Sequence, residues 1–466
     1  MRHIHLIGIG GTGLSAIARV LIERGFHVSG SDLVASPLFK AITTAGAKTF
    51  LGHRAEQITG ADIVIRSSAI PESNPEVQAA REQGIPVLKR ADFLSELTQG
   101  KDTLAVAGTH GKTTTTSMLI WMLEKLDINP SFISGAVIKQ LGCNARAGSG
   151  PYFVIEADEY DSMFLGLSPK IAVITNVEHD HPDCFPTETT YFNAFKAFLQ
   201  RIRDDGLALI CKDDPHAREL MENMADSGMQ LLSYGTGSDS TYQIGKIELS
   251  DGTPCFTLNF TDKNGSQETL GQVQLNIPGY HNILNATAAL AVIHQLDLPM
   301  DSAVQALGNF MGTNRRFEIL GTAQGITMID DYGHHPTEIS ATLDAAHSRF
   351  PKERIWAIWQ PHTYSRTQTL EEGYIRALSA ADKVVVLKIY AAREADTGYS
   401  AETIAHALPE DKAHYIPDFP TATRFLLENL QAGDVAIIFS AGDAVAISKQ
   451  VFDSLRKRHD QNGSSR

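Results

Sequence analysis

The chain has 466 residues, more than the roughly 100–200 residues of one domain, so we expect about three domains. Hydrophobic residues make up 43% and charged residues 20%, as in ordinary globular proteins, and no apolar run reaches the roughly 18 residues that span a bilayer. The formal net charge of −14 argues against a nucleic-acid partner, because phosphate contacts need a basic surface.

The cysteine pattern and the N-terminus indicate where the protein works. The cysteines stand far apart without a Cys-x-x-Cys pair, which argues against a zinc ribbon and a disulfide framework and favours a reduced, cytoplasmic protein. The chain runs from Met1 almost directly into a strand-like segment, so we expect no signal peptide. We expect no membrane partner, and a monomer or weak homodimer.

The first part of the chain alternates between strands and helices. A strand at His3–Ile9 leads through glycines into a helix at Leu14–Arg24. Further strands are predicted at His27–Asp32, Asp62–Ser68 and Pro86–Arg90, before a polar linker at 98–101.

The first glycine loop, Gly8-Ile9-Gly10-Gly11-Thr12-Gly13, satisfies G-x-G-x-x-G between a strand and a helix. Asp32 ends the next strand, about 20 residues further on, as in a dinucleotide site. The physical requirement is only a diphosphate near backbone N–H groups, which UDP meets as readily as NAD. NAD or NADP, another nucleotide diphosphate and a tight turn without a ligand all remain open from this motif alone.

A second unit opens with a second glycine loop. After a strand at Asp102–Ala107 come Gly108-Thr109-His110-Gly111-Lys112-Thr113-Thr114, a turn that ends in Gly-Lys-Thr at a helix start. Val106 stands where the full P-loop has its first glycine, so the match is incomplete. The chemistry still fits ATP, since backbone N–H groups cradle phosphates, Lys112 reaches the β- and γ-phosphates and the Thr113 hydroxyl binds Mg²⁺.

Later strands of this unit end in polar clusters. Strands are predicted at Tyr152–Ala157, Ile171–Val177 and Gly206–Cys211, and then an antiparallel meander at Gln243–Leu249, Cys255–Phe260 and Gln272–Ile277, before a helix near His281. Glu156 ends its strand where a Mg²⁺ ligand belongs, although a solvated acidic turn is the alternative. His179 and His181 beside acids leave a zinc site open, but no cysteine lies near.

In the last part of the chain, predicted strands again alternate with helices. Its strands are predicted at Ile326–Asp330, Ile355–Trp359, Lys383–Tyr390 and Asp434–Ser440, and the last ten or so residues are expected to fray. The predicted architecture is α/β with three domains: a Rossmann-like domain at residues 1–98, a central P-loop ATPase-like domain with a small antiparallel sheet at 99–312, and a C-terminal Rossmann-like domain at 313–466.

These segments together resemble the Mur ligases, the ATP-dependent amide-forming enzymes of peptidoglycan precursor synthesis. The likeness runs along the whole chain and is carried by ordered motifs: the first glycine loop, Gly108–Thr116, Glu156–Asp161, Thr175–Asp183, His281–Asn285, Arg315–Phe317, Asp330–Pro336 and Gln360–Thr367. So many matches in order are more specific than either glycine loop.

The resemblance implies that ATP and Mg²⁺ act with two small-molecule substrates, UDP-N-acetylmuramate and L-alanine. It places the UDP-sugar at Gly10, Gly11, Thr12, Gly13, Asp32, His53, Ser67 and Ser68. It places ATP at Gly108, Thr109, His110, Gly111, Lys112, Thr113, Thr114, His281, Asn282, Asn285, Arg315, Arg316 and Asp331, and the metal at Thr113, Glu156 and His181. It implies catalytic roles for Lys112, His334, His335 and Arg366, with His362 and Arg366 on the amino acid.

Alternatives and departures remain. His53 and Ser67-Ser68 can simply cap turns, Arg315-Arg316 can be a surface pair, His334-His335-Pro336 a helix start, and Arg366 solvated. Tyr160 and Arg393 stand where related sequences often have serine and glycine, which leaves a tripeptide-recycling ligase as an alternative. A dehydrogenase using the first loop and a non-catalytic nucleotide-binding regulator are the alternatives from other classes.

Overall fold

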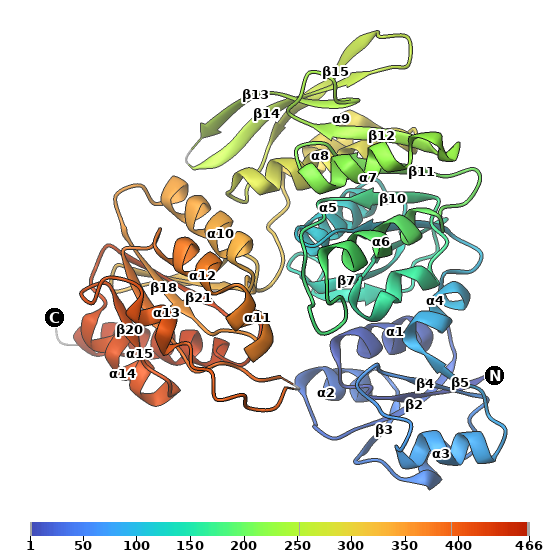
Figure 1. Ribbon diagram of the computed structural model, residues 1–466, viewed down its shortest axis with the longest axis horizontal. Helices are drawn as coiled ribbons and strands as arrows, with labels where there is room; N and C mark the ends of the chain where they lie inside the picture. The colour runs from blue at the N-terminus through green and yellow to red at the C-terminus, as the bar shows by residue number, and fades with distance from the viewer. Residues whose placement is uncertain (1, 251, 393, 464–466) are drawn as a thin grey trace.

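The protein folds around three β-sheets, each built from a successive part of the chain and flanked by helices (Figure 1). The computed structural model describes residues 2–250, 252–392 and 394–463. Within those residues no helix combines the length and the apolar character needed to cross a membrane.

The N-terminal sheet has five parallel strands in the order β3-β2-β1-β4-β5. The strands are β1 (His3–Ile7), β2 (His27–Asp32), β3 (Lys48–Leu51), β4 (Ile63–Arg66) and β5 (Val87–Lys89). The helices are α1 (Thr12–Glu23), α2 (Pro37–Thr44), η1 (Ala55–Ile58), α3 (Pro75–Glu82) and α4 (Arg90–Thr98). The order reverses beside β1, so the glycine loop that follows β1 opens at the crevice where such sheets bind ligands.

The central sheet has ten strands in the order β15-β14-β13-β12-β11-β10-β6-β9-β7-β8. The strands are β6 (Asp102–Ala107), β7 (Ser131–Ile138), β8 (Cys143–Arg146), β9 (Tyr152–Glu156), β10 (Ile171–Ile174), β11 (Leu207–Cys211), β12 (Gln230–Gly235), β13 (Tyr242–Ser250), β14 (Thr253–Thr261) and β15 (Gln267–Gln274). The helices are α5 (Lys112–Lys125), η2 (Tyr160–Gly166), α6 (Glu188–Leu199), α7 (Pro215–Asn223), η3 (Ala225–Ser227), α8 (Tyr280–Gln295) and α9 (Met300–Gly308).

Four neighbouring strands of this sheet bring a row of polar side chains to one edge. β11, β10, β6 and β9 are adjacent and parallel, so their carboxyl ends lie side by side. At or just beyond these ends lie Asp213, Thr175, the phosphate loop and Glu156, in that order across the edge. Sheet order, rather than nearness in sequence, therefore assembles the site.

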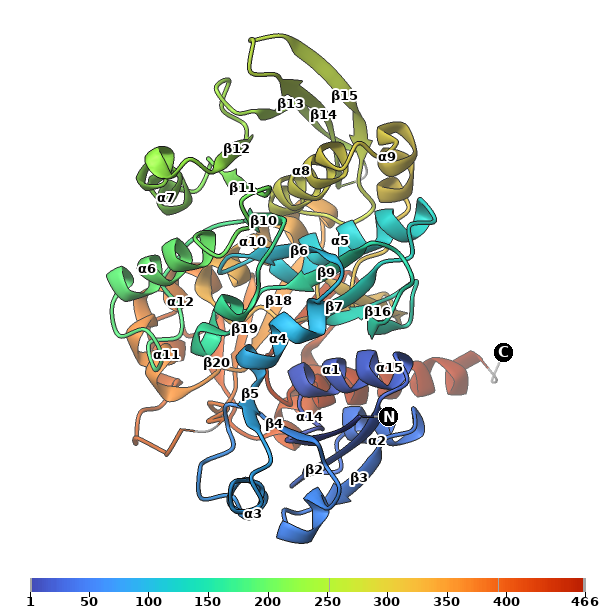
Figure 2. The ribbon, with the colours of Figure 1, turned by 90° about the vertical axis from the view of Figure 1, so that its right-hand side faces the viewer.

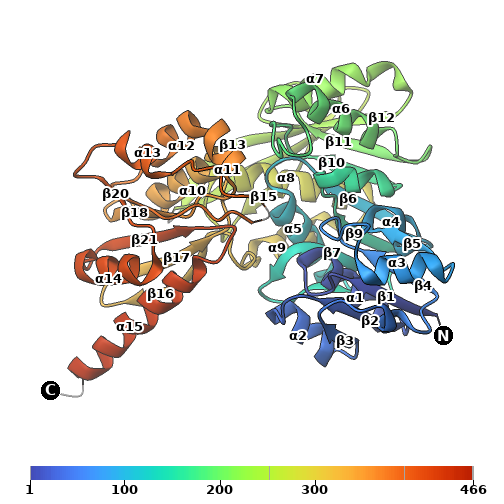
Figure 3. The ribbon, with the colours of Figure 1, turned by 60° about the horizontal axis from the view of Figure 1, so that its bottom comes forward.

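The C-terminal sheet has the order β16-β17-β21-β18-β19-β20, with only β16 antiparallel to its neighbour. The strands are β16 (Glu318–Ala323), β17 (Ile326–Asp331), β18 (Arg354–Trp359), β19 (Lys383–Val386), β20 (Ala413–Tyr415) and β21 (Asp434–Phe439). The helices are α10 (Pro336–Arg349), α11 (Tyr364–Thr369), α12 (Glu371–Leu378), α13 (Glu402–His406), α14 (Phe419–Asn429) and α15 (Val445–Gly463). Figure 3 shows α15 extending away from the body of the protein.

Three of the predicted segments differ in the structure, apart from strands that were not predicted at all. The meander is not a separate sheet, because β13 pairs in parallel with β12 and extends the central sheet, whose three last strands project beyond the other elements (Figure 2). Its third strand is β15, several residues earlier than predicted, since the exposed segment alternates only weakly. The C-terminal helix continues to Gly463, where we expected fraying.

The N-terminal and central domains share one hydrophobic core. Helix α1 buries Leu14, Ile17 and Leu21 in the same cluster as residues of β9, β10 and α6. The apolar residues of α1 recur every three or four positions, so one face meets its own sheet and another meets β7 and β8. The two domains are thereby held as one packed unit, while the C-terminal sheet has cores of its own.

Asp330→Asn is expected to stabilise the protein at pH 8 more than at pH 5. Burial on β17 raises the pKa of Asp330 to about 6, with nearby Glu318 adding to the effect, and its Oδ1 atom has no hydrogen-bond partner among the described residues. The folded protein thus binds this proton more tightly than the unfolded chain does. The resulting stability is fully present below the ordinary pKa of 3.8 and is lost as the pH rises through about 6. The advantage of the variant should grow by about 1–2 kcal/mol, measured by urea unfolding at both pH values. An equal difference at both would contradict the assignment.

Candidate functional site

The second glycine loop folds tightly between β6 and α5. Gly108 has a φ of 135°, and a Cβ atom there would lie 1.9 Å from Thr175 Oγ1. Gly111 has a φ of 81°, and a Cβ atom would lie 2.4 Å from Asn285 Oδ1. Only glycine fits both positions, and the N-terminus of α5 is left without a side-chain cap, so its backbone N–H groups are available to an anion.

Lys112 begins α5 and turns back across the loop. Its Nζ donates to the carbonyl oxygen of Thr109 at 3.0 Å and lies 2.9 Å from Glu159 Oε2. Burial would lower the pKa of Lys112, but Glu159, Asp158 and Glu156 outweigh that effect and raise it above its ordinary value. The ammonium is therefore charged and fixed at the mouth of the loop.

A hydroxyl and a carboxylate meet directly beside Lys112. The Thr113 hydroxyl donates to Glu156 Oε1 at 3.0 Å, and the Gly135 N–H donates to Glu156 Oε2 at 2.6 Å. A Cβ atom on Gly135 would lie within 2.8 Å of both side chains, so the glycine keeps the space in front of them open. Burial raises the pKa of Glu156. An oxygen pair with clear space in front of it matches the ligands that Mg²⁺ takes in nucleotide sites.

His181 lies on the other side of Glu159. Its Nε2 atom is 3.7 Å from Glu159 Oε1, its backbone has a φ of 54°, and the ring of Tyr160 meets the imidazole edge-on at 5.1 Å between centroids. His179 does not join it, because its Nε2 atom bonds the Phe185 carbonyl. The two histidines therefore do not form the pair that a zinc site in this segment would need.

A cavity of about 780 Å³ opens between the phosphate loop, α8 and the C-terminal domain. Of the residues predicted for ATP, it is lined by His110, Gly111, Thr113, Thr114, His281, Asn282, Asn285, Arg316 and Asp331. Burial and nearby Arg316 lower the pKa of His281 to about 4, so its imidazole is neutral. The volume of the cavity lies in the range of pockets that bind ligands the size of a nucleotide.

Arg315, also predicted for ATP, is not among the described residues that line this cavity. Its backbone has a φ of 61°, and its guanidinium bonds the carbonyl of Ser440 and lies over the ring of Tyr332. Adjacent residues in this turn point to opposite sides, so only Arg316 faces the cavity. Asp331 lines the cavity, but its carboxylate accepts hydrogen bonds from the backbone N–H groups of Phe317 and Gly333.

Sequence reasoning missed the far wall of the cavity. Asp213, Tyr234, Thr236 and Tyr280 line it after β11, along β12 and at the start of α8. The Asp213-Asp214 pair directly after a predicted strand was the available signal, as for Glu156. Tyr234 gave none, because it lies on a strand that the pattern did not reveal.

Arg366 is buried at the boundary between the central and C-terminal domains. Its Nε and Nη2 atoms both donate to Asp180 Oδ1, at 2.9 and 2.7 Å, and Nη1 lies 3.1 Å from His362 Nδ1. Arg366 holds the pKa of Asp180 well below its usual range despite the burial of that carboxylate. The side chain is therefore not solvated, and its forked edge already binds a protein carboxylate. Its Nη1 side, next to His362, is what remains for an amino acid.

His334 and His335 lie where β17 gives way to α10. Burial, reinforced by Arg366, lowers the pKa of His334 well below its usual value, and burial lowers that of His335 to about 4. His335 is the N-cap of α10 and accepts the N–H of Thr337. His334 is thus neutral and lies with its ring 5.6 Å from that of His362, while His335 is occupied at the helix start.

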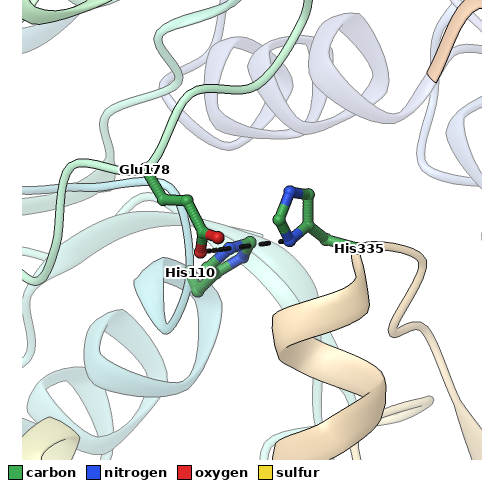
Figure 4. Close-up of side chains that lie close together, drawn as sticks. All are labelled: His110, Glu178 and His335. Carbon is green, nitrogen blue, oxygen red and sulfur yellow. Dashed lines mark hydrogen bonds and ion pairs between the residues drawn. The ribbon is translucent and has the colours of Figure 1, made fainter. Parts of the chain in front are cut away.

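Figure 4 shows His110, Glu178 and His335 pointing toward one another. Their ligand-type atoms lie within 4.8 Å of each other, the only such group among the described residues. Although burial works against it, hydrogen bonds to Glu178 and Glu338 raise the pKa of His110 to about 9. The imidazole therefore carries a proton that a metal ion would have to displace, and the group is an ion-pair cluster.

The residues predicted for the UDP-sugar gather at the carboxyl edge of the N-terminal sheet. Asp32 Oδ2 accepts the Gly10 N–H at 2.9 Å, which holds the first glycine loop closed. His53 Nδ1 lies 2.9 Å from Ser31 Oγ and 3.2 Å from Glu76 Oε2. Gly11 caps α1 without a side-chain bond, so the helix N-terminus is available to a diphosphate.

The same edge meets the central domain. The Ser68 hydroxyl donates to Asp161 at 2.8 Å, and Arg90 Nη2 lies 3.2 Å from Asp158 Oδ2. A Cβ atom on Gly13 would collide with Arg90. These contacts place the first glycine loop on the side of the domain that faces Lys112 and Glu159. Arg393 lies outside the described residues.

Three family models match successive parts of the chain. They are described as the Mur ligase family catalytic domain, over residues 3–102, the Mur ligase middle domain, over 106–293, and the Mur ligase glutamate ligase domain, over 315–442.

Relatives match over nearly the full length. The UDP-N-acetylmuramate–L-alanine ligase of Acidithiobacillus ferrooxidans is 42% identical over 97% of both chains, and that of Alkaliphilus metalliredigens is 39% identical over 97% of both. The structure of the UDP-N-acetylmuramate–alanine ligase of Thermotoga maritima superposes with a TM-score of 0.83 at 28% identity, covering 98% of this chain and 100% of the other. A murein peptide ligase of Psychrobacter arcticus gives 0.73 at 25%, with 98% and 99% covered.

Proposed function

This chain belongs to the Mur ligase family and is an ATP-dependent ligase of peptidoglycan precursor synthesis, and from that premise we propose how its residues perform the reaction. The reaction joins the lactyl carboxylate of UDP-N-acetylmuramate to the amine of L-alanine and releases ADP and phosphate. The observation that carries the assignment to this site is that the Lys112–Glu159 pair of the central domain and Arg366 of the C-terminal domain lie on either side of His181, which is 3.7 Å from Glu159 Oε1 and 3.4 Å from Arg366 Nη2. Residues 1–98, 99–312 and 313–466 take the sugar nucleotide, ATP and the amino acid, respectively.

Lys112 has the central role in activating the carboxylate. A carboxylate does not react with an amine at neutral pH, so ATP first transfers its γ-phosphoryl group to form an acyl-phosphate. The protein contributes mainly positioning and charge neutralisation. Lys112, held by Glu159, places a fixed positive charge at the transferring group, while the N–H groups of 108–114 bind the other phosphates.

Arg316 and the faces of α8 complete the ATP site. Arg316 extends from the C-terminal domain into the cavity and contributes a second cation near the phosphates. His281, Asn282 and Asn285 line the wall formed by α8, with Asn285 accepting the Thr115 hydroxyl and donating to Asn282. We assign the adenine and ribose to this side of the cavity, together with the residues that follow β11.

Thr113, Glu156 and His181 are the residues that would hold Mg²⁺. The Thr113–Glu156 pair and the open space that Gly135 leaves fit such an ion. When bound, Mg²⁺ neutralises negative charge on the phosphates and on the muramate carboxylate, which otherwise repel each other. His181 lies across Glu159 from Lys112 and would serve a second position.

His334 is the better placed of the two histidines to take a proton from the amine. It is neutral, and it faces His362 beside the Nη1 atom of Arg366. His335 instead caps α10. The alanine carboxylate would bind at Arg366 Nη1 and His362, and the amine would then lie within reach of His334.

The sugar nucleotide is assigned to the first glycine loop. The diphosphate would bind at the N-terminus of α1, near Gly11–Gly13, with His53 and Ser67-Ser68 on the flanking segments. Asp32 acts through the loop, which it holds in shape, as well as on the ligand. The described cysteines are all free, as expected for the reducing cytoplasm, where we place the reaction.

The proposal is tested by phosphate release with UDP-N-acetylmuramate and ATP, offering L-alanine against the tripeptide L-alanyl-γ-D-glutamyl-meso-diaminopimelate. We expect release with L-alanine and none above background with the tripeptide. The opposite preference would assign the chain to the recycling reaction, for which Tyr160 is the feature in favour. Release with neither substrate would overturn the ligase assignment, and micromolar NADH binding, read by fluorescence, would revive the dehydrogenase.

A further inference from the structure

The side chain of His110 points out of the phosphate loop toward the C-terminal domain. His110 lies between Thr109 and Gly111, and its backbone N–H and carbonyl are bound by Asn176. Its Nε2 atom is 3.0 Å from Glu178 Oε2, and its Nδ1 atom is 3.5 Å from Glu338 Oε1 on α10. Both ring nitrogens are thus used by carboxylates, one from each domain.

Glu338 connects His110 to the start of α10. Its Oε2 atom accepts the N–H groups of His334 and His335, which closes the capping box of the helix, and its Oε1 atom lies 3.1 Å from Arg316 Nη1. The side chain is 10% exposed. One carboxylate therefore fixes the segment that carries His334, orders Arg316 in the ATP cavity and meets the phosphate loop.

A second link runs parallel to the first. Thr337, at the start of α10, donates its hydroxyl to Glu178 Oε1 at 2.8 Å, and the ring of His335 lies 4.8 Å from that of His110. Glu178 follows β10 and belongs to the central domain. The seam between the domains thus consists of His110 and Glu178 on one side and the first turn of α10 on the other.

We propose that His110 is a positioning residue that clamps the start of α10 onto the phosphate loop and so couples ATP use to amide formation. The proposal rests on the proposed function and assigns His110 a role beyond binding ATP. With the clamp in place, the segment that carries His334 is held over the phosphate loop, where the acyl-phosphate forms. Two carboxylates facing each other would repel, and the imidazolium between them makes closure favourable.

Without the clamp, the site should leak to water. Water then replaces the amine as nucleophile, attacks the acyl-phosphate and returns the muramate carboxylate and inorganic phosphate. ATP is consumed, and no amide forms. Formation of the acyl-phosphate itself depends first on Lys112 and Glu156, whose side chains bond Glu159 and Thr113 rather than His110.

His110→Gln in the full chain tests the clamp, with inorganic phosphate and the amide product measured in the same reaction. We expect phosphate released per amide to rise from near one to several-fold above one, and the KM for L-alanine to rise about tenfold. Thr337→Val should shift the same ratio in the same direction, by less. His347→Gln, on the exposed far end of α10 against the Ala380 carbonyl, is the matched control and should keep the ratio near one.

Other outcomes overturn the proposal. A raised KM for ATP with the ratio still near one would make His110 a nucleotide ligand only. A ratio near one in both His110→Gln and Thr337→Val would show that the seam does not control coupling, whether or not the first variant is less stable. Failure of the wild-type chain to form amide is a different result, because it contradicts the proposed function and not the clamp.

Discussion

Lys112→Ala is expected to lower phosphate release by roughly 10²–10³-fold or more while leaving the affinity for UDP-N-acetylmuramate nearly unchanged. The ammonium is the charge that the structure fixes at the mouth of the phosphate loop, bound to two loop carbonyls and Glu159. Removing it leaves Glu159, buried at 1% exposure, without its cation, so the local field turns negative where the γ-phosphate must bind. The sugar nucleotide is assigned to a different glycine loop, on the N-terminal domain.

The measurement pairs a phosphate-release assay with calorimetric titration of UDP-N-acetylmuramate in the absence of ATP. Lys101→Ala is the matched control, since its ammonium bonds the Gly148 carbonyl away from the loop and the variant should keep both properties. If Lys112→Ala lost sugar-nucleotide binding to the same extent as phosphate release, the division of labour between the two glycine loops would be wrong.

Most of the buried sheet could be predicted from the sequence, because its strands are short continuous apolar runs. β6, β10 and β11 are buried throughout or nearly so, and each was recognised as such a run. β7 and β12 were missed, since both mix serine or glycine with exposed positions. The pairing of β12 with β13 depends on tertiary contacts that no local pattern records.

The sequence predicts those parts of the site that lie at the carboxyl ends of recognisable strands. Glu156 ends one recognisable strand and Thr175 follows another, and the structure brings both to the phosphate loop. The sequence did not reveal the direction in which a side chain points. Arg315 and Arg316 are adjacent and equally basic, yet Arg315, whose φ is positive, points away from the cavity. The partner of Arg366 was equally hidden, because Asp180 lies in another domain.

Arg366→Met is expected to lower kcat/KM for L-alanine by about 10²–10³-fold. Removing one partner of a buried ion pair costs about 3–5 kcal/mol, because the other charge is left buried and unpaired. Asp180 is 6% exposed and takes two hydrogen bonds from the same guanidinium. Arg366→Lys should recover only part of the activity, since an ammonium keeps the charge and loses the fork. Steady-state kinetics at varied L-alanine, with sugar-nucleotide affinity as a control, measure both.

The double variant Asp180→Asn/Arg366→Met separates the two roles that Arg366 can have. If Arg366 only neutralises Asp180, removing both charges relieves the unpaired carboxylate, and activity should return most of the way. If Arg366 also binds the alanine carboxylate through Nη1, next to His362, the double variant should regain stability in urea unfolding while its KM for L-alanine stays raised. We expect the second result. If the KM recovered together with the stability, Arg366 would not bind the amino acid. Its role would then be the ion pair with Asp180, which joins the C-terminal domain to the segment that carries His181.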